Sequence, residues 1–166
     1  FLTTDGALKV LDFGVARMHD VATGSLATVT GMRIGTPAFM PPEQALGRTN
    51  EIDARTDLWA VGATMFALLA GRTVHTAEHA AELIVISATT PPRPLVDFAP
   101  DVPAAIASVV DRAVQFKQEE RWPDARDMQQ ALEAAHREAF GEALDPASVG
   151  PKPVPRVVIP KTEDER

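Results

Sequence analysis

The sequence contains no cysteine, which excludes a disulfide-stapled scaffold and a metal site built on thiolates. It also lacks any run of basic residues, and its 16 Lys and Arg against 23 Asp and Glu give a net charge of −7. Binding to nucleic acid by counterion release needs clustered positive charge, so we expect no nucleic-acid partner. The longest apolar stretch, Leu58 to Gly71, has 14 residues. A membrane-spanning helix needs about 20, so we expect no membrane segment.

The overall composition is that of a globular chain. Apolar residues make up 45% and charged residues 23% of the 166 residues, a length that suits one domain with its own core. The chain begins at Phe1 rather than Met and shows no signal-peptide pattern, so we expect it to be cut from a longer protein.

The first 40 residues predict a hairpin followed by a long loop. Strand-like segments at 1–3 and 7–11 flank Thr4-Asp5-Gly6, and Asp-Gly is a signal for a tight turn with positive φ. From Gly14 to Met40 the sequence is rich in Thr, Gly and Met and shows no apolar period. A loop of roughly 25 residues is far longer than usual and is typical of a functional segment.

Helical patterns begin after this loop. The apolar run predicts a helix over about 57–70, capped by Thr56 or Asp57 and ended by Gly71. A second helix is predicted near 77–88. Its predicted cap and inner face are Thr76, Ala80, Leu83, Ile84 and Ser87.

The stretch Thr90–Pro103 contains five prolines, which predicts an extended crossover rather than a helix. Two amphipathic helices are predicted beyond it, one after Asp101 and one after Trp122-Pro123. Their inner faces are Ile106, Val109, Val110, Ala113 and Val114 in the first, and Ala125, Met128, Leu132 and Ala135 in the second. Residues 141–166 are rich in proline and predict a disordered tail or linker, which leaves 1–140 as the domain.

One tripeptide has chemistry of its own. Asp12-Phe13-Gly14 follows the second predicted strand, and a carboxylate fixed at a strand end suits a hard cation such as Mg²⁺ that bridges phosphates. On local chemistry alone, the favoured explanation of Asp12 is a residue that caps a turn.

Several further motifs follow Asp12-Phe13-Gly14 in a characteristic order. The long loop ends in Gly35-Thr36-Pro37-Ala38-Phe39-Met40-Pro41-Pro42-Glu43, the sequence Asp57-Leu58-Trp59-Ala60-Val61-Gly62 opens the apolar helix, and Arg121 precedes the last helix. Together with Asp12-Phe13-Gly14, this pattern over about residues 1–138 resembles the C-terminal lobe of eukaryotic-like (Hanks-type) bacterial serine/threonine protein kinases. One departure is Pro41, where the family has Ala in its Ala-Pro-Glu motif.

The resemblance implies a fold and a set of roles. The fold would be mainly α, a kinase-like C-terminal lobe with a small β-hairpin at its start and without the N-terminal lobe. Asp12 would bind the Mg²⁺ on the ATP phosphates, and Phe13 beside Gly14 would pack inward and set the active or inactive state. Phe1 and Leu11 would line the adenine pocket, and Thr36 would form part of the substrate pocket.

The resemblance also assigns structural roles. Glu43 would pair with Arg121, although the two could equally be separate surface charges. Asp57 would accept hydrogen bonds from the catalytic-loop backbone, although it could simply cap a helix. Trp59 is expected in the core on either interpretation. The four histidines, which show no spacing typical of a metal site, are expected at the surface: His19, His75, His79 and His136.

Some parts of a kinase are missing from the sequence. It has no Gly-x-Gly-x-x-Gly and no His-Arg-Asp, both of which phosphoryl transfer in this family uses. We therefore expect an incomplete serine/threonine kinase, inactive alone, that takes ATP and Mg²⁺ as cofactors and a protein as substrate, in the cytoplasm. The alternative is a non-catalytic helical module that binds partner proteins.

The long loop also offers sites of modification. A phosphate there would add charge and could order the loop by pairing with arginines. Thr28 and Thr30 are the preferred candidates because they lie nearest the substrate-pocket end, and Ser25 is the reserve. The alternative is that these are ordinary polar loop residues.

Overall fold

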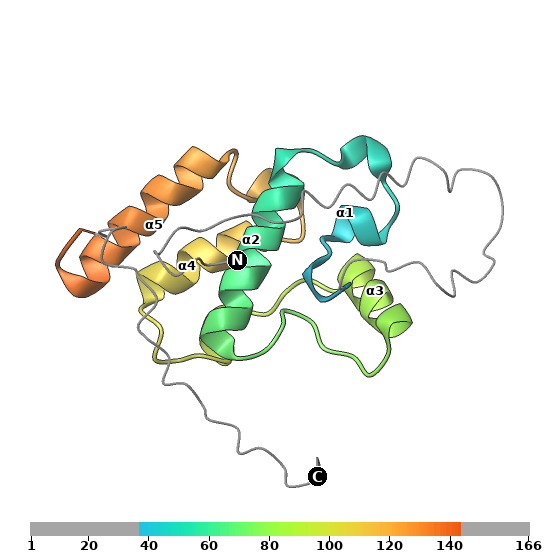
Figure 1. Ribbon diagram of the computed structural model, residues 1–166, viewed down its shortest axis with the longest axis horizontal. Helices are drawn as coiled ribbons and strands as arrows, with labels where there is room; N and C mark the ends of the chain where they lie inside the picture. Colours follow the sequence, from blue (N-terminus) through green and yellow to red (C-terminus); the bar gives the residue numbers. More distant parts are fainter. Residues whose placement is uncertain (1–36, 144–166) are drawn as a thin grey trace, which may run out of the picture. The chain divides into compact units, whose positions relative to one another are not determined.

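The computed structural model describes residues 37–143 (Figure 1). This part of the chain is helical and contains no strand, which confirms the mainly α fold. The predicted hairpin and the proline-rich tail lie outside the described residues. The α-helices are α1 (Pro42–Ala45), α2 (Ala54–Ala70), α3 (Ala80–Thr89), α4 (Ala104–Ala113) and α5 (Ala125–Phe140). No helix in the described part combines the length and the apolar character that crossing a lipid bilayer requires.

Helix α2 begins three residues before its predicted start. Asp53 is the N-cap: its carboxylate accepts the backbone N–H of Arg55 at 2.8 Å, and its own N–H is 3.4 Å from the Thr56 hydroxyl. The prediction that Thr56 or Asp57 is the cap was wrong, because the apolar pattern begins only at Leu58 and hides a polar first turn. The predicted end is confirmed, since Gly71 has the left-handed conformation with φ 67°.

Helix α4 lies at the centre of the packing and contacts both α2 and α5 (Figure 1). Two clusters of buried side chains result. The first is Trp59, Ala63, Phe66, Val74, Leu95, Ala107, Val110 and Val114, and the second is Leu58, Val109, Ala113, Met128 and Ala135. The inner faces predicted for α4 and α5 are confirmed, except that Ala125 is exposed at the first turn of α5.

The α2 and α4 backbones approach closely at Gly62. A Cβ atom placed on Gly62 would lie 2.5 Å from the Cβ of Ala113, which is closer than two carbon atoms can pack. Glycine is therefore the residue that allows α4 to lie directly on α2.

Helix α3 begins at Ala80, later than predicted, and packs against α1 (Figure 1). Thr76 does not cap it, because the Thr76 hydroxyl accepts a hydrogen bond from Arg72 at 3.0 Å in the preceding loop. Of the predicted inner face, Ser87 is buried while Ala80 is exposed.

The proline-rich crossover is confirmed, with one 3-10 turn, η4 (Leu95–Asp97). Leu95 is fully buried, and its backbone N–H donates to the Asp111 carboxylate of α4 at 2.8 Å. Phe98 lies farther along the crossover. The guanidinium of Arg72, in the loop after α2, lies 4.3 Å from the centre of the Phe98 ring, and that of Arg93 lies 4.8 Å from it. The crossover is thus attached to α4 at Leu95 and to the loop that follows α2 at Phe98.

Candidate functional site

The most elaborate polar site in the described residues is built on Glu43 and Arg121. Glu43 lies in the first turn of α1, behind Pro41 and Pro42, whose fixed φ angles suit a helix entrance. Arg121 lies between η5 (Gln118–Glu120) and α5. Two parallel hydrogen bonds join them: Nη2 to Oε2 at 2.8 Å and Nη1 to Oε1 at 2.9 Å. Their side chains are 3% and 0% exposed, so this ion pair is buried.

Arg121 uses its full hydrogen-bonding capacity. Besides the two bonds to Glu43, Nε donates to the Gln115 carbonyl at 2.8 Å. Nη1 donates to the Arg55 carbonyl and Nη2 to the Phe116 carbonyl, both at 3.3 Å. A guanidinium has five N–H donors, and here all five have an acceptor. One side chain therefore joins α1, the first turn of α2 and the turn that follows α4.

Glu43 is equally well surrounded. Its Oε1 accepts from the Thr56 hydroxyl at 2.9 Å and from the Gln118 amide at 3.0 Å, in addition to Arg121. Burial by itself raises the pKa of Glu43. The Arg121 guanidinium, a backbone N–H and the Thr56 hydroxyl outweigh this effect and hold the pKa below its ordinary value. Glu43 is therefore ionised at neutral pH in spite of its burial.

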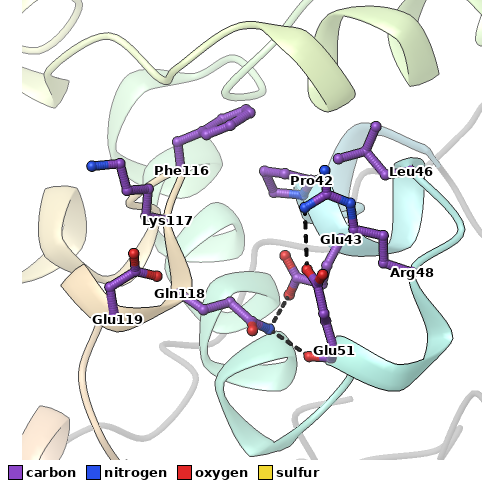
Figure 2. A pocket seen from close by; sticks show the side chains of 9 residues that line it. All are labelled: Pro42, Glu43, Leu46, Arg48, Glu51, Phe116, Lys117, Gln118 and Glu119. Atoms are coloured by element: carbon purple, nitrogen blue, oxygen red, sulfur yellow. Dashed lines mark hydrogen bonds and ion pairs between the residues drawn. The ribbon is translucent and has the colours of Figure 1, made fainter.

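A pocket of about 210 Å³ opens beside the ion pair (Figure 2). Phe116 and Leu46 lie on its two sides, and an Arg48–Glu51 ion pair at 3.3 Å also lines it. The remaining lining residues are Pro42, Glu43, Lys117, Gln118 and Glu119. The pocket thus carries both signs of charge.

The other predicted site residues have different fates. Asp57 is exposed in the first turn of α2. Trp59 is fully buried, as expected, and its Nε1 has no hydrogen-bond partner within residues 37–143. Nine predicted residues lie outside the described part of the chain: Phe1, Leu11, Asp12, Phe13, Gly14, Ser25, Thr28, Thr30 and Thr36.

The placement of His75 at the surface was wrong. Only 8% of this residue is exposed, and burial lowers the pKa of its imidazole. Its position in the loop after α2 gave no periodic signal of burial. No group of three or more metal-binding side chains occurs in residues 37–143.

Sequence reasoning missed the role of Gln118. The residue belongs to a turn of charged residues and lies 75 positions from Glu43, so neither spacing nor periodicity connects the two. Thr56 was considered only as a helix cap, and its bond to Glu43 was likewise missed. Both contacts depend on the tertiary fold alone.

Comparison with known proteins identifies the family. The profile of the protein kinase domain matches residues 1–135. The chain is 38% identical over 128 residues to the serine/threonine-protein kinase Pkn1 of Myxococcus xanthus, which covers 77% of this chain and 18% of that protein. It is 38% identical over 129 residues to the serine/threonine-protein kinase PksC of Streptomyces coelicolor, covering 76% and 22%. It is also 35% identical over 138 residues to the tyrosine-protein kinase MasK of Myxococcus xanthus, covering 80% and 20%.

The chain thus spans about a fifth of the length of the curated relatives it matches. The matched region contains both Asp12-Phe13-Gly14 and the segment that ends at Glu43. The resemblance predicted from these motifs is confirmed: the chain belongs to the protein kinase family and is similar to its bacterial serine/threonine members.

Proposed function

We propose that this chain contains the C-terminal lobe of a protein kinase domain that transfers the γ-phosphoryl group of ATP to serine or threonine hydroxyls of proteins. The observation that carries the proposal is the match of the kinase domain over residues 1–135, a range that includes an intact Asp12-Phe13-Gly14. A module that only binds partners has no physical need for this carboxylate. We assign residues 1–140 to the kinase domain and 141–166 to a tail or linker.

Asp12 is the proposed metal ligand. When bound, Mg²⁺ would neutralise charge on the ATP phosphates, and carboxylate oxygen is the donor type that this ion prefers. Phe1 and Leu11 would contact the adenine. Thr36 would contact the substrate hydroxyl. These residues of the chain bind and orient the reactants, and such positioning accounts for most of the catalysis in phosphoryl transfer.

The buried Glu43–Arg121 ion pair also supports the proposal, because Glu43 lies at the end of the segment that contains Thr36. Glu43 follows Thr36 by seven positions, and its bonds to Arg121 and Thr56 attach the end of this segment to the helical core. A substrate-binding loop needs such an anchor because a small misplacement of reacting groups lowers the rate strongly. We propose that Glu43 and Arg121 hold the substrate segment in place.

Two features of the proposal concern activity and its control. As an isolated polypeptide the 166 residues should transfer no phosphate, because they contain neither the catalytic-loop aspartate nor the ATP-binding lysine of the family. Phosphorylation of Thr28 or Thr30, or of Ser25 in reserve, would order the long loop that contains these residues. Mass spectrometry of the active kinase tests this, and the absence of phosphate on all three residues would contradict it.

The identity of the acceptor hydroxyl needs its own test, because one relative is named as a tyrosine kinase. The product of the complete reading frame that encodes these residues should be incubated with radiolabelled ATP, Mg²⁺ and a mixture of protein substrates, and then subjected to phosphoamino-acid analysis. We expect label on phosphoserine and phosphothreonine. Label on phosphotyrosine alone would replace the proposed substrate class, and no transfer to any protein would refute the enzymatic proposal in favour of a binding module.

A further inference from the structure

Gln118 makes two hydrogen bonds that connect distant parts of the fold. Its amide nitrogen donates to Oε1 of Glu43 at 3.0 Å and to the backbone carbonyl of Glu51 at 2.9 Å. Figure 2 shows both bonds leaving the same nitrogen, one toward α1 and one toward η3 (Thr49–Glu51). A primary amide has two N–H donors, so both are occupied.

The two acceptors lie on either side of a tight turn. Gly47 has φ 67°, and the Arg48 N–H donates to the Glu43 carbonyl at 2.9 Å, so the chain reverses between α1 and η3. The turn's own side-chain contact is the exposed Arg48–Glu51 pair, which contributes little in water. Among the hydrogen bonds between residues 37–143, the Gln118 bond is the one side-chain bond that joins η3 to a distant part of the chain.

The chemistry of this position favours a neutral donor. Glu43 lies directly opposite Gln118, with Arg121 behind it, and Arg48 and Glu51 line the same pocket. On its own turn, Gln118 is flanked by Lys117 and Glu119. A carboxylate at position 118 would face the ionised Glu43 at hydrogen-bond distance and repel it, whereas an apolar side chain would leave the Glu51 carbonyl without this donor.

We propose that Gln118 is a positioning residue that completes the donor set of Glu43 and clamps the α1–η3 turn against the turn before α5. The clamp fixes the end of the segment that contains Thr36 and thereby contributes to binding of the protein substrate, an inference that rests on the proposed function. The role is a specific one, because it requires two N–H donors and no charge at position 118.

Amide hydrogen exchange of the 166-residue chain tests the clamp without reference to activity. In Gln118→Glu at pH 8, amides of residues 46–52 should exchange about tenfold or more faster than in the parent. Because a carboxylate beside Glu43 has a raised pKa, lowering the pH to 5 protonates it and turns it into a donor. The ratio to the parent rate should therefore fall at pH 5 but stay above one, because a protonated carboxyl group has one O–H donor where the amide has two N–H donors. Gln118→Met, which has no donor and no charge, should exchange faster at both pH values.

The chain offers a matched control. Gln129 on α5 also donates its amide to a glutamate, Glu133, at 2.9 Å, but this pair is exposed. Gln129→Glu should leave exchange in residues 46–52 unchanged at both pH values. Unchanged exchange there in both Gln118→Glu and Gln118→Met would overturn the clamp, and the neutral Met variant decides the matter if the Glu variant fails to fold.

Kinetics of the complete reading-frame product test the functional part. Gln118→Met should raise KM for the protein substrate and leave KM for ATP unchanged. Faster exchange with unchanged kinetic constants would overturn the positioning role while leaving the clamp in place. Absence of transfer in the parent enzyme would refute the proposed function and the substrate-binding role together, and the exchange experiment would still decide whether the clamp exists.

Discussion

Replacing Arg121 by alanine should destabilise this fold more than any exposed ion-pair substitution. The change removes five hydrogen bonds at once and leaves the Glu43 carboxylate without its cationic partner, with Thr56 and Gln118 as its remaining side-chain donors. It also leaves three backbone carbonyls without these donors, those of Arg55, Gln115 and Phe116. The loss therefore has two sources, an uncompensated charge and unsatisfied acceptors.

The magnitude follows from the burial of the pair. Removing one partner of a buried, hydrogen-bonded ion pair costs about 3–5 kcal/mol. Natural domains of ordinary size have a free energy of unfolding of about 5–15 kcal/mol, so the loss is a large fraction of the total. For a chain of this length it corresponds to a fall in Tm of roughly 6–20 °C. Thermal and urea unfolding followed by circular dichroism measure both quantities.

Two controls separate burial from charge. Lys117→Ala breaks the Lys117–Glu120 pair at 3.0 Å, whose side chains are 63% and 47% exposed, and should shift Tm little. Glu43→Gln should also destabilise, and the double variant Glu43→Gln with Arg121→Ala should cost less than the sum of the two single changes, because no charge is then stranded.

The pH dependence of the stability provides an independent test, because it should differ in direction between the parent and Arg121→Ala. In the parent, the lowered pKa of Glu43 means that its ionised form stabilises the fold above its unfolded pKa, and this contribution is lost as the pH falls through the folded pKa. Without Arg121, burial dominates and raises the pKa, so the variant should lose stability as the pH rises. The difference between parent and variant should therefore grow from pH 4 to pH 7. A loss below about 1 kcal/mol, strict additivity in the cycle, or a difference independent of pH would refute the reasoning.

Three further predictions concern the core and its titrating groups. Gly62→Ala should cost about 1–3 kcal/mol because the new methyl group meets the Ala113 Cβ at 2.5 Å, and the cost should fall in an Ala113→Gly background, as measured by urea unfolding. The free energy of unfolding should decline as the pH falls below 6.5, since the unfolded chain takes up a proton that buried His75 resists. His75→Gln should flatten this decline, and the same change at exposed His79 should not; equal slopes in all three chains would contradict the assignment. Burial raises the pKa of Asp111, so Asp111→Asn, which keeps an acceptor, should be at least as stable as the parent at pH 7, whereas Asp111→Ala should lose about 1–3 kcal/mol; equal stabilities of the two variants would contradict this role.

Elements with a strong period were predictable from the sequence. The inner face of α4 could be identified because Val109, Val110 and Ala113 recur at helical spacing, and all three are buried. The end of α2 was equally clear, since Gly71 supplies the positive φ that a helix C-terminus needs. Helix starts were less certain. Thr76 looks like a cap, but its hydroxyl is engaged by Arg72, and α3 begins without any side-chain cap.

In the candidate site, too, some contacts could be predicted from the sequence and others could not. Glu43 and Arg121 lie 78 positions apart, and only the family resemblance brought them together before the structure was known. Gln118 and Thr56 could not be found in this way, because their roles arise where three elements meet in space. The burial of His75 was missed for the same reason, since a loop residue carries no periodic signal.

The central claim is that this chain is part of a protein kinase that transfers phosphate from ATP to proteins, and it is tested most directly at Asp12. The complete reading-frame product and its Asp12→Ala and Asp12→Asn variants should be assayed for transfer of label from ATP to protein in the presence of Mg²⁺, with matched circular dichroism spectra to establish equal folding. We predict transfer by the parent and a fall to background in both variants, because each removes the carboxylate that we propose as the Mg²⁺ ligand. Undiminished transfer in the variants, or none in the parent, would contradict the account.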